Sequence, residues 1–188
     1  MRLLAILAVA MLVSACAGDD DQVLRPSGLE TEPVDGVPAD WATYTDPVAL
    51  FTVRYPAEWF LDGNSVHSRD LSSEINLPGY RPHDVLAIGF GRYEAKGSNG
   101  CGAVRLDPAT GEATEPAPGA TTTTLGGAPA WEIIRTEGDN AIQGELTRIH
   151  AVSLVRNGQC INVGAYFYQN TPDEATFSQI LGSFELLQ

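Results

Sequence analysis

Residues 147–168, TRIHAVSLVRNGQCINVGAYFY, contain two β-rich runs joined by Asn157-Gly158. An Asn-Gly pair between two such runs is typical of a hairpin with a type I′ turn, because both central residues of that turn take positive φ. A two-residue turn also fixes the register of the two strands. The predicted partners on one face, which is mostly apolar and should meet the core, are Leu154 with Ile161, Val152 with Val163, and His150 with Ala165. The other face pairs Val155 with Cys160 and Ser153 with Asn162.

Further strands are predicted before this hairpin. Residues 41–45 and 50–55 are rich in β-formers, residues 51–55 alternate in polarity, and Pro56 ends the second strand. Residues 85–90, VLAIGF, are apolar on both faces, which predicts a central strand. Residues 130–135, AWEIIR, predict the strand that precedes the hairpin.

A long loop is predicted over residues 94–124. This segment contains five glycines, three prolines and a run of threonines at 121–124. A loop of this length is uncommon inside a compact domain and is either functional or mobile. Its composition leaves three roles open, namely partner contact, attachment of O-linked sugar and simple mobility.

The C-terminal residues predict one helix and a last short strand. Thr171 is suited to the N-cap, Pro172 to the first helical position, and Glu174 completes a capping box. The predicted buried stripe is Phe177, Ile180 and Leu181. Gly182 is suited to stop the helix, and residues 183–187 then predict a strand.

Together these elements amount to about six or seven strands, mostly in meander order, and one late helix. That pattern predicts an α+β domain with an antiparallel sheet over residues 41–188. A domain of this size buries enough of its unfolded surface, roughly 70%, to fold alone.

The first residues, MRLLAILAVAMLVSACAGDDD, have the organisation of an export signal. Arg2 precedes an apolar stretch, 3–13, that is too short to span a bilayer. The stretch ends in Val13-Ser14-Ala15-Cys16, which resembles a bacterial lipobox. An ordinary secretory signal cut after Ala15, with Cys16 incidental, is the alternative.

The lipobox resemblance implies a specific modification of Cys16. The thiol would receive a diacylglyceryl group, and removal of residues 1–15 would make Cys16 the first residue of the mature protein. At least two acyl chains would then anchor the protein, which is the number that stable anchoring needs. We therefore expect a lipid-anchored protein on the outer side of the cell membrane, in the cell envelope.

Residues 16–40 are predicted to be an acidic, disordered tether. They contain many acidic residues and no periodicity that would give an amphipathic face. Asp19-Asp20-Asp21 is better explained as part of this solvated segment than as a calcium site, because adjacent carboxylates without a turned loop do not surround an ion. The whole chain has 24 acidic and 11 basic residues, a formal charge of −13, which argues against nucleic acid as a partner.

Cys101 and Cys160 remain once Cys16 is lipidated. Two cysteines in an oxidising compartment predict a disulfide, which would pin the long loop to the non-core face of the hairpin. Two unpaired thiols are the alternative.

Two stretches suggest a family. YTDPVALFTVRYPAEWF, residues 44–60, is similar to the opening of PsbP-like proteins, and TFSQILGSFELL, residues 176–187, is similar to their closing helix and strand. The resemblance implies an antiparallel β-sheet flanked by helices, with a C-terminal helix. The founding members are extrinsic subunits of photosystem II, and many bacterial relatives are lipoproteins. The matching residues are structural, so the resemblance implies no catalytic residue.

No motif indicates catalysis or a cofactor. The chain lacks G-x-S-x-G, C-x-x-C, H-E-x-x-H and a P-loop. Gly89-Phe90-Gly91 resembles the start of a dinucleotide fingerprint, but no third glycine follows and both glycines are assigned to a strand. The histidines, with Asp84 beside His83, lack the spacing of a local metal site; they are His67, His83 and His150. His150 is better explained as a hydrogen-bonded residue at a sheet edge.

These observations predict a non-enzymatic binding or scaffolding module of the envelope. Its partners would be the membrane, through Cys16, and another envelope component. The predicted contact surface consists of Tyr80, Tyr93, Tyr166 and Tyr168 beside the 94–124 loop. Two alternatives remain, namely a small-molecule pocket between sheet and helix, and a hydrolase with a site assembled across the fold.

Overall fold

The computed structural model describes residues 36–48, 50–71, 85–136, 146–168 and 174–187. The chain divides into two units, Met1–Glu32 and Pro33–Gln188, and everything described belongs to the second. The predicted signal peptide, Cys16 and most of the tether therefore lie outside the described residues. The last residues of the predicted tether, 36–40, belong to the folded unit, and the Arg54 guanidinium donates to the carbonyls of Pro38 and Ala39.

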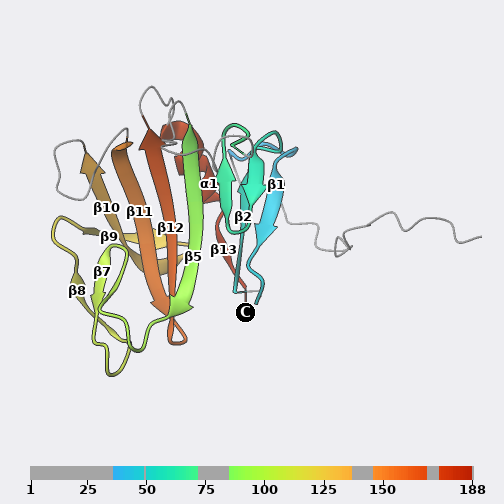
Figure 1. Cartoon of the computed structure of the whole chain (residues 1–188). Helices are drawn as coiled ribbons and strands as arrows, with labels where there is room; N and C mark the ends of the chain where they lie inside the picture. The colour runs from blue at the N-terminus through green and yellow to red at the C-terminus, as the bar shows by residue number, and fades with distance from the viewer. Residues whose placement is uncertain (1–35, 49, 72–84, 137–145, 169–173, 188) are drawn as a thin grey trace, which may run out of the picture. The chain divides into compact units, whose positions relative to one another are not determined.

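The described residues contain thirteen strands and one helix (Figure 1). The first five strands are β1 (Ala42–Thr45), β2 (Phe51–Tyr55), β3 (Phe60–Asp62), β4 (Ser65–His67) and β5 (Leu86–Glu94). The next four are β6 (Gly100–Cys101), β7 (Val104–Leu106), β8 (Ala113–Pro116) and β9 (Thr121–Leu125). The last elements are β10 (Ala128–Thr136), β11 (Leu146–Arg156), β12 (Gln159–Tyr168), α1 (Glu174–Gly182) and β13 (Glu185–Leu186). None of the described helical segments is long and apolar enough to cross a membrane.

A seven-stranded antiparallel sheet is the centre of the fold. Its strand order is β3-β4-β5-β12-β11-β10-β9, so two meanders meet where β5 pairs with β12. The strand predicted over 85–90 lies inside this sheet, between β4 and β12, as its apolar sequence indicated.

The hairpin of β11 and β12 confirms the register predicted from its turn. Arg156 faces Gln159, and each of the five predicted pairs is present. Asn157 and Gly158 have φ of 52° and 74°, which is the backbone conformation that a type I′ turn requires.

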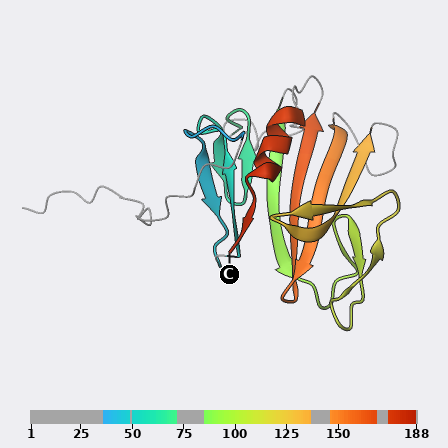
Figure 2. The ribbon, with the colours of Figure 1, turned by 180° about the vertical axis from the view of Figure 1, so that it is seen from behind.

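The main core lies between one face of the large sheet and a layer made by β1, β2, β13 and α1. The first three form their own antiparallel sheet in the order β1-β2-β13. Rings stack between and within these layers, with Tyr44 on Phe90 at 4.8 Å and Phe51 on Phe184 at 4.9 Å between ring centroids. Figure 2 shows α1 beside the large sheet, where Phe177 and Ile180 are fully buried in the same core.

A second layer covers part of the opposite face of the large sheet. Strands β6, β7 and β8 form a small antiparallel sheet, and β9 joins the edge of the large one. The prediction of a long loop over 94–124 is therefore wrong. These strands are two to five residues long, so none is long enough to show a clear alternation, and the glycines between them form turns.

The predicted fold class is also wrong. We expected an α+β fold, PsbP-like, with an antiparallel sheet flanked by helices, whereas the described residues are mostly β and contain one helix of nine residues. Strands make up most of the layers on both faces of the large sheet, and α1 is the one described helix in them.

The C-terminal helix itself is present. It spans Glu174–Gly182, and the predicted Thr171 and Pro172 lie outside the described residues. Phe177 and Ile180 are buried as predicted, whereas Leu181 is only partly buried. Gly182 is the last helical residue rather than a left-handed stop, and the predicted strand follows as β13.

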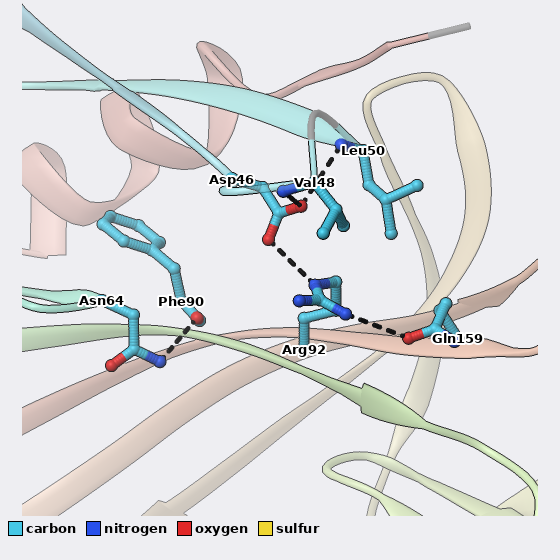
Figure 3. A network of polar contacts seen from close by, with 7 residues as sticks. All are labelled: Asp46, Val48, Leu50, Asn64, Phe90, Arg92 and Gln159. Atoms are coloured by element: carbon cyan, nitrogen blue, oxygen red, sulfur yellow. Dashed lines mark hydrogen bonds and ion pairs between the residues drawn. The ribbon is translucent and has the colours of Figure 1, made fainter.

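A buried ion pair joins the turn between β1 and β2 to the large sheet (Figure 3). One oxygen of Asp46, a residue that is only 3% exposed, accepts hydrogen bonds from the backbone N–H of Val48 and Leu50. The other accepts the Arg92 Nε at 3.0 Å, and Arg92 also donates to Gln159 at 3.3 Å. Asp46 therefore holds the turn and the sheet together.

We expect Asp46→Ala to lower the free energy of unfolding by about 2–3 kcal/mol, because it leaves two backbone donors and a partly buried guanidinium without their acceptor. Urea unfolding would measure this loss. The matched control is Glu115→Ala, which removes an exposed ion pair with Arg105 and should cost less than about 0.5 kcal/mol. Equal losses in the two variants would contradict this account of Asp46.

Candidate functional site

The face of the large sheet that points away from the main core is called here the outer face. The small sheet covers part of it. At the boundary, the Ser153 hydroxyl donates to the Asn162 side-chain oxygen at 2.7 Å, and the N–H of Ala103 donates to the Ser153 hydroxyl at 3.0 Å. Beyond Asn162, the outer faces of β4, β5 and β12 form the part that we call the open half.

Three glycines lie together on the open half. Gly89 and Gly91 are two residues apart on β5 and share one face, since side chains alternate along a strand. Gly164 of β12 lies directly opposite Gly89, and Asn162 lies opposite Gly91. We call these three residues the glycine patch.

The fold does not require glycine at these three positions. None of the three has positive φ. A Cβ atom at Gly89 would meet its nearest neighbours, in Ser65 and Tyr166, at 3.8 and 3.9 Å, and the closest approach at Gly91 and Gly164 is 3.5 Å. These are ordinary van der Waals distances. Glycine inside a strand lowers stability, and it often marks a place where a ligand approaches the backbone closely.

We expect Gly89→Ala to leave the fold intact and to raise its stability by up to about 0.5–1 kcal/mol, because alanine has less backbone entropy to lose on folding. Thermal unfolding followed by circular dichroism would measure the change. Gly111→Ala is the control. A Cβ at Gly111 would lie 2.7 Å from the backbone nitrogen of Lys96 at a φ of 77°, so this variant should be clearly destabilised. A destabilised Gly89→Ala protein would show that the fold needs this glycine after all.

Polar side chains surround the glycine patch. The Tyr166 hydroxyl and the Asn162 amide nitrogen both lie 3.5 Å from the point where a Cβ of Gly164 would be, and the Ser65 hydroxyl lies 3.8 Å from the corresponding point at Gly89. Within the part of the chain that the structure describes, these three donors have no side-chain hydrogen bond to another residue. They are therefore available to a ligand.

His67 and Asp62 belong to the same face. His67 of β4 pairs with Ala87, which in turn faces Tyr166, and Asp62 pairs with Ser65. Burial lowers the pKa of His67, and the Asp62 carboxylate opposes this only in part. The imidazole is therefore neutral at pH 7 and presents one donor and one acceptor.

The predicted tyrosine surface is distributed along the outer face. Tyr166 lies at the glycine patch and Tyr168 follows it on the same face of β12. Tyr93 of β5 faces Cys160. It lies six residues along β5 from Ala87, the partner of Tyr166, and strand geometry makes that separation about 20 Å. Its hydroxyl donates to the Gly100 carbonyl, and burial raises its pKa. Tyr80 lies outside the described residues.

The predicted disulfide is present. Cys101 and Cys160 are joined by a bond of 2.03 Å between β6 and β12. Both residues are fully buried in a small apolar cluster with Ala95, Val104 and Leu106, separate from the main core. Cys160 therefore points away from that core, as the hairpin register predicted.

A second polar cluster lies between the large sheet and α1. His150 Nε2 is 2.6 Å from a carboxylate oxygen of Glu132, and His150 Nδ1 is 3.8 Å from Glu174. Arg148 pairs with Glu174 at 3.3 Å and lies over the ring of Phe167 at 4.1 Å. These contacts attach the first turn of α1 to β10 and β11.

His150 differs from expectation in one respect. We predicted a hydrogen-bonded residue at a sheet edge, and the hydrogen bond is present, but β11 is an interior strand paired on both sides. His83 and Asp84 lie outside the described residues. Among the described histidines, cysteines and acids, no three are placed to hold a metal ion.

The glycine patch was not found from the sequence alone. The spacing of Gly89 and Gly91 did show that both share one face of a strand. Gly164 lies far along the chain, and only the pairing of β5 with β12 brings it next to them. Nothing local in the sequence predicts that pairing.

Comparison with known proteins adds no function. No family model matches the chain, and no curated protein matches it. The chain superposes on a protein from Bacteroides thetaiotaomicron VPI-5482, known from a crystal structure at 1.50 Å resolution, with a TM-score of 0.44 and 13% identity. The superposition covers 78% of this chain and 48% of that one, so this chain spans about half the length of the other protein. A likeness of this degree identifies neither a family nor a function.

Proposed function

We propose that this protein is a lipid-anchored protein of the cell envelope that acts as a non-enzymatic binding module, with the open half of the outer face as its binding surface. The lipobox-like Val13-Ser14-Ala15-Cys16 supports the anchor and the location. The acidic segment that follows it supports a tether between the membrane and the folded unit.

The observation that most supports a binding role is the glycine patch. Three glycines lie in two interior strands at positions where a Cβ would meet its neighbours at ordinary contact distances, and they are surrounded by side-chain donors that make no hydrogen bond within the described part of the chain. Such an arrangement is typical of a surface that another molecule approaches closely. Phe60 of β3, which is 45% exposed on the same face, extends this surface.

Contacts elsewhere favour this proposal over its two alternatives. The space between the large sheet and α1 is occupied by fully buried Phe177 and Ile180, which argues against a pocket there. The described contacts of His150 are with Glu132, Glu174 and Phe177, and none of these is the serine, threonine or cysteine that a triad-type hydrolase would use.

Two measurements test the proposal. Mass spectrometry of the native protein should find two or more acyl chains on an N-terminal Cys16, and Cys16→Ser should release the protein from the membrane fraction. A photocrosslinking amino acid at Ala87, on the open half, should then join the protein to a specific envelope component in intact cells. The same group at Thr114, an exposed residue of β8, is the control.

A bare thiol at residue 16 would overturn the anchoring. Equal crosslinking from residues 87 and 114, or none from either, would overturn the assignment of the binding surface.

A further inference from the structure

We infer that the glycine patch binds an uncharged sugar ring, as part of a glycan. This inference rests on the proposed function, which makes the open half of the outer face the binding surface. It names the chemical class of the ligand from three properties of the patch, namely its flat floor, its aromatic ring and its balance of charge.

The floor suits a flat ring. Gly89 and Gly164 lie opposite one another and Gly91 lies next along β5, so three neighbouring positions of an interior sheet carry no side chain. At Gly89 and Gly164 the strands are paired on each side, by β4 and β12 for β5, and by β5 and β11 for β12. A peptide strand that adds to a free sheet edge therefore has no edge to pair with here.

Tyr166 supplies the aromatic surface. Its ring lies over Gly164, which is buried, with one ring carbon 3.5 Å from the Cβ position of Gly164 and 3.9 Å from that of Gly89, while Gly89 and Gly91 stay partly exposed. The face of an aromatic ring carries negative charge density. The C–H bonds on one side of a pyranose are weakly positive, so such a ring stacks on a tyrosine as a cation does, but more weakly.

The polar groups at the patch match hydroxyls. Asn162 offers an amide donor, Tyr166 and Ser65 offer hydroxyls that both donate and accept, and the neutral His67 does the same with its two nitrogens. A ligand made of hydroxyl groups also donates and accepts at every position. An apolar ligand would instead leave these groups without hydrogen-bond partners, which costs affinity.

The charge of the patch disfavours anions. Among the described polar groups named above around the patch, the Asp62 carboxylate is the charged one, because burial lowers the pKa of His67. The chain as a whole has a formal charge of −13. Phosphate groups and uronic acids would therefore be repelled, whereas neutral sugars would not.

The test is titration of the full mature chain with neutral hexasaccharides of glucose, mannose and N-acetylglucosamine, followed by calorimetry and by amide chemical shifts. At least one of these sugars should bind with a Kd below about 10 mM, which is the weak range for a single site. Tyr166→Ala should weaken that binding about tenfold or more, whereas Tyr166→Phe, which keeps the ring, should weaken it less.

A second variant separates binding from folding. Gly89→Val adds a side chain to the floor at a position where its Cβ would meet the nearest neighbours, in Ser65 and Tyr166, at 3.8 and 3.9 Å, so it should abolish binding while thermal unfolding stays near the native value. Thr114→Ala, on the exposed β8, should change neither. An oligogalacturonate of the same length, which is anionic, should bind at least about tenfold more weakly than the neutral sugar.

Three results would overturn the inference. The first is that no neutral hexasaccharide binds. The second is that binding is unaffected in both Tyr166→Ala and Gly89→Val. The third is that the anionic sugar binds with the same affinity as the neutral sugar. If the sugars fail while residue 87 still crosslinks to one specific protein, the ligand class is wrong and the proposed binding surface stands. If both fail, the proposed function fails as well.

Discussion

Gly102→Ala is expected to destabilise the protein by about 3 kcal/mol or more, from the combined cost of overpacking and of a left-handed backbone. Gly102 has a φ of 53°, and a Cβ atom there would clash with the Ser153 hydroxyl and the Asn162 side-chain oxygen. The clash would separate the small sheet from the large one at the position where Ala103 donates to Ser153. Urea unfolding measures the loss.

Gly119→Ala is the matched control for Gly102. Its φ is 83°, so it carries the same kind of backbone strain, but no atom lies within 4 Å of the added Cβ. We expect it to cost about 1–2 kcal/mol, the strain alone. If the two variants lose the same free energy of unfolding, the close packing of Gly102 on the Ser153–Asn162 pair contributes nothing to the loss in Gly102→Ala.

Removing the disulfide is expected to cost about 4 kcal/mol, the chain-entropy value for a loop closed by cysteines 59 residues apart. The double variant Cys101→Ala with Cys160→Ala removes the bond and leaves no free thiol at these positions. Its free energy of unfolding should match that of the wild-type protein in reducing agent, measured by urea unfolding.

A control confirms that the bond itself is measured. Reducing agent should shift the unfolding midpoint of the wild-type protein and leave that of the double variant unchanged. A loss below about 1 kcal/mol would mean that the unfolded chain is already compact around this loop, so that the bond restricts it little.

The parts of the fold that were predicted correctly depend on local signals. Asn157-Gly158 determines both the turn and the register of β11 and β12, and the capping and spacing around Glu174 and Phe177 indicate the helix. The disulfide followed from the number of cysteines and from the face of Cys160. Each of these conclusions needs only residues that are neighbours in sequence, or a count.

The small sheet was missed because its signals are individually weak. β6 is two residues long and β7 is three, so alternation cannot be recognised over them. The glycines that suggested a loop are in fact turn residues, with positive φ at Gly97, Gly102, Gly111 and Gly119. Their spacing of five to nine residues is the spacing of short hairpins.

The candidate site was missed for a different reason. Tyr166 was part of the predicted tyrosine surface, but its significance comes from Gly89. Gly89 lies on β5, which is far from β12 in sequence and next to it in the sheet. Pairing between β5 and β12 depends on how the two meanders join. The free energy gained by this pairing is distributed over contacts in the whole core, so no local motif indicates it. The same limit applies to the fold class, because strands provide most of both covering layers and α1 is the one described helix in them.

The pairing of β13 with β2 has a consequence for how the chain acquires its structure. Glu185 lies beside Thr52 and Leu186 beside Phe51, so the two ends of the folded unit are adjacent strands of one sheet. Such contacts between distant positions have a high loop-closure cost, and proteins rich in them fold slowly. The main core therefore closes only after β13 has paired with β2, and until then the edge of β2 that faces β13 is unpaired.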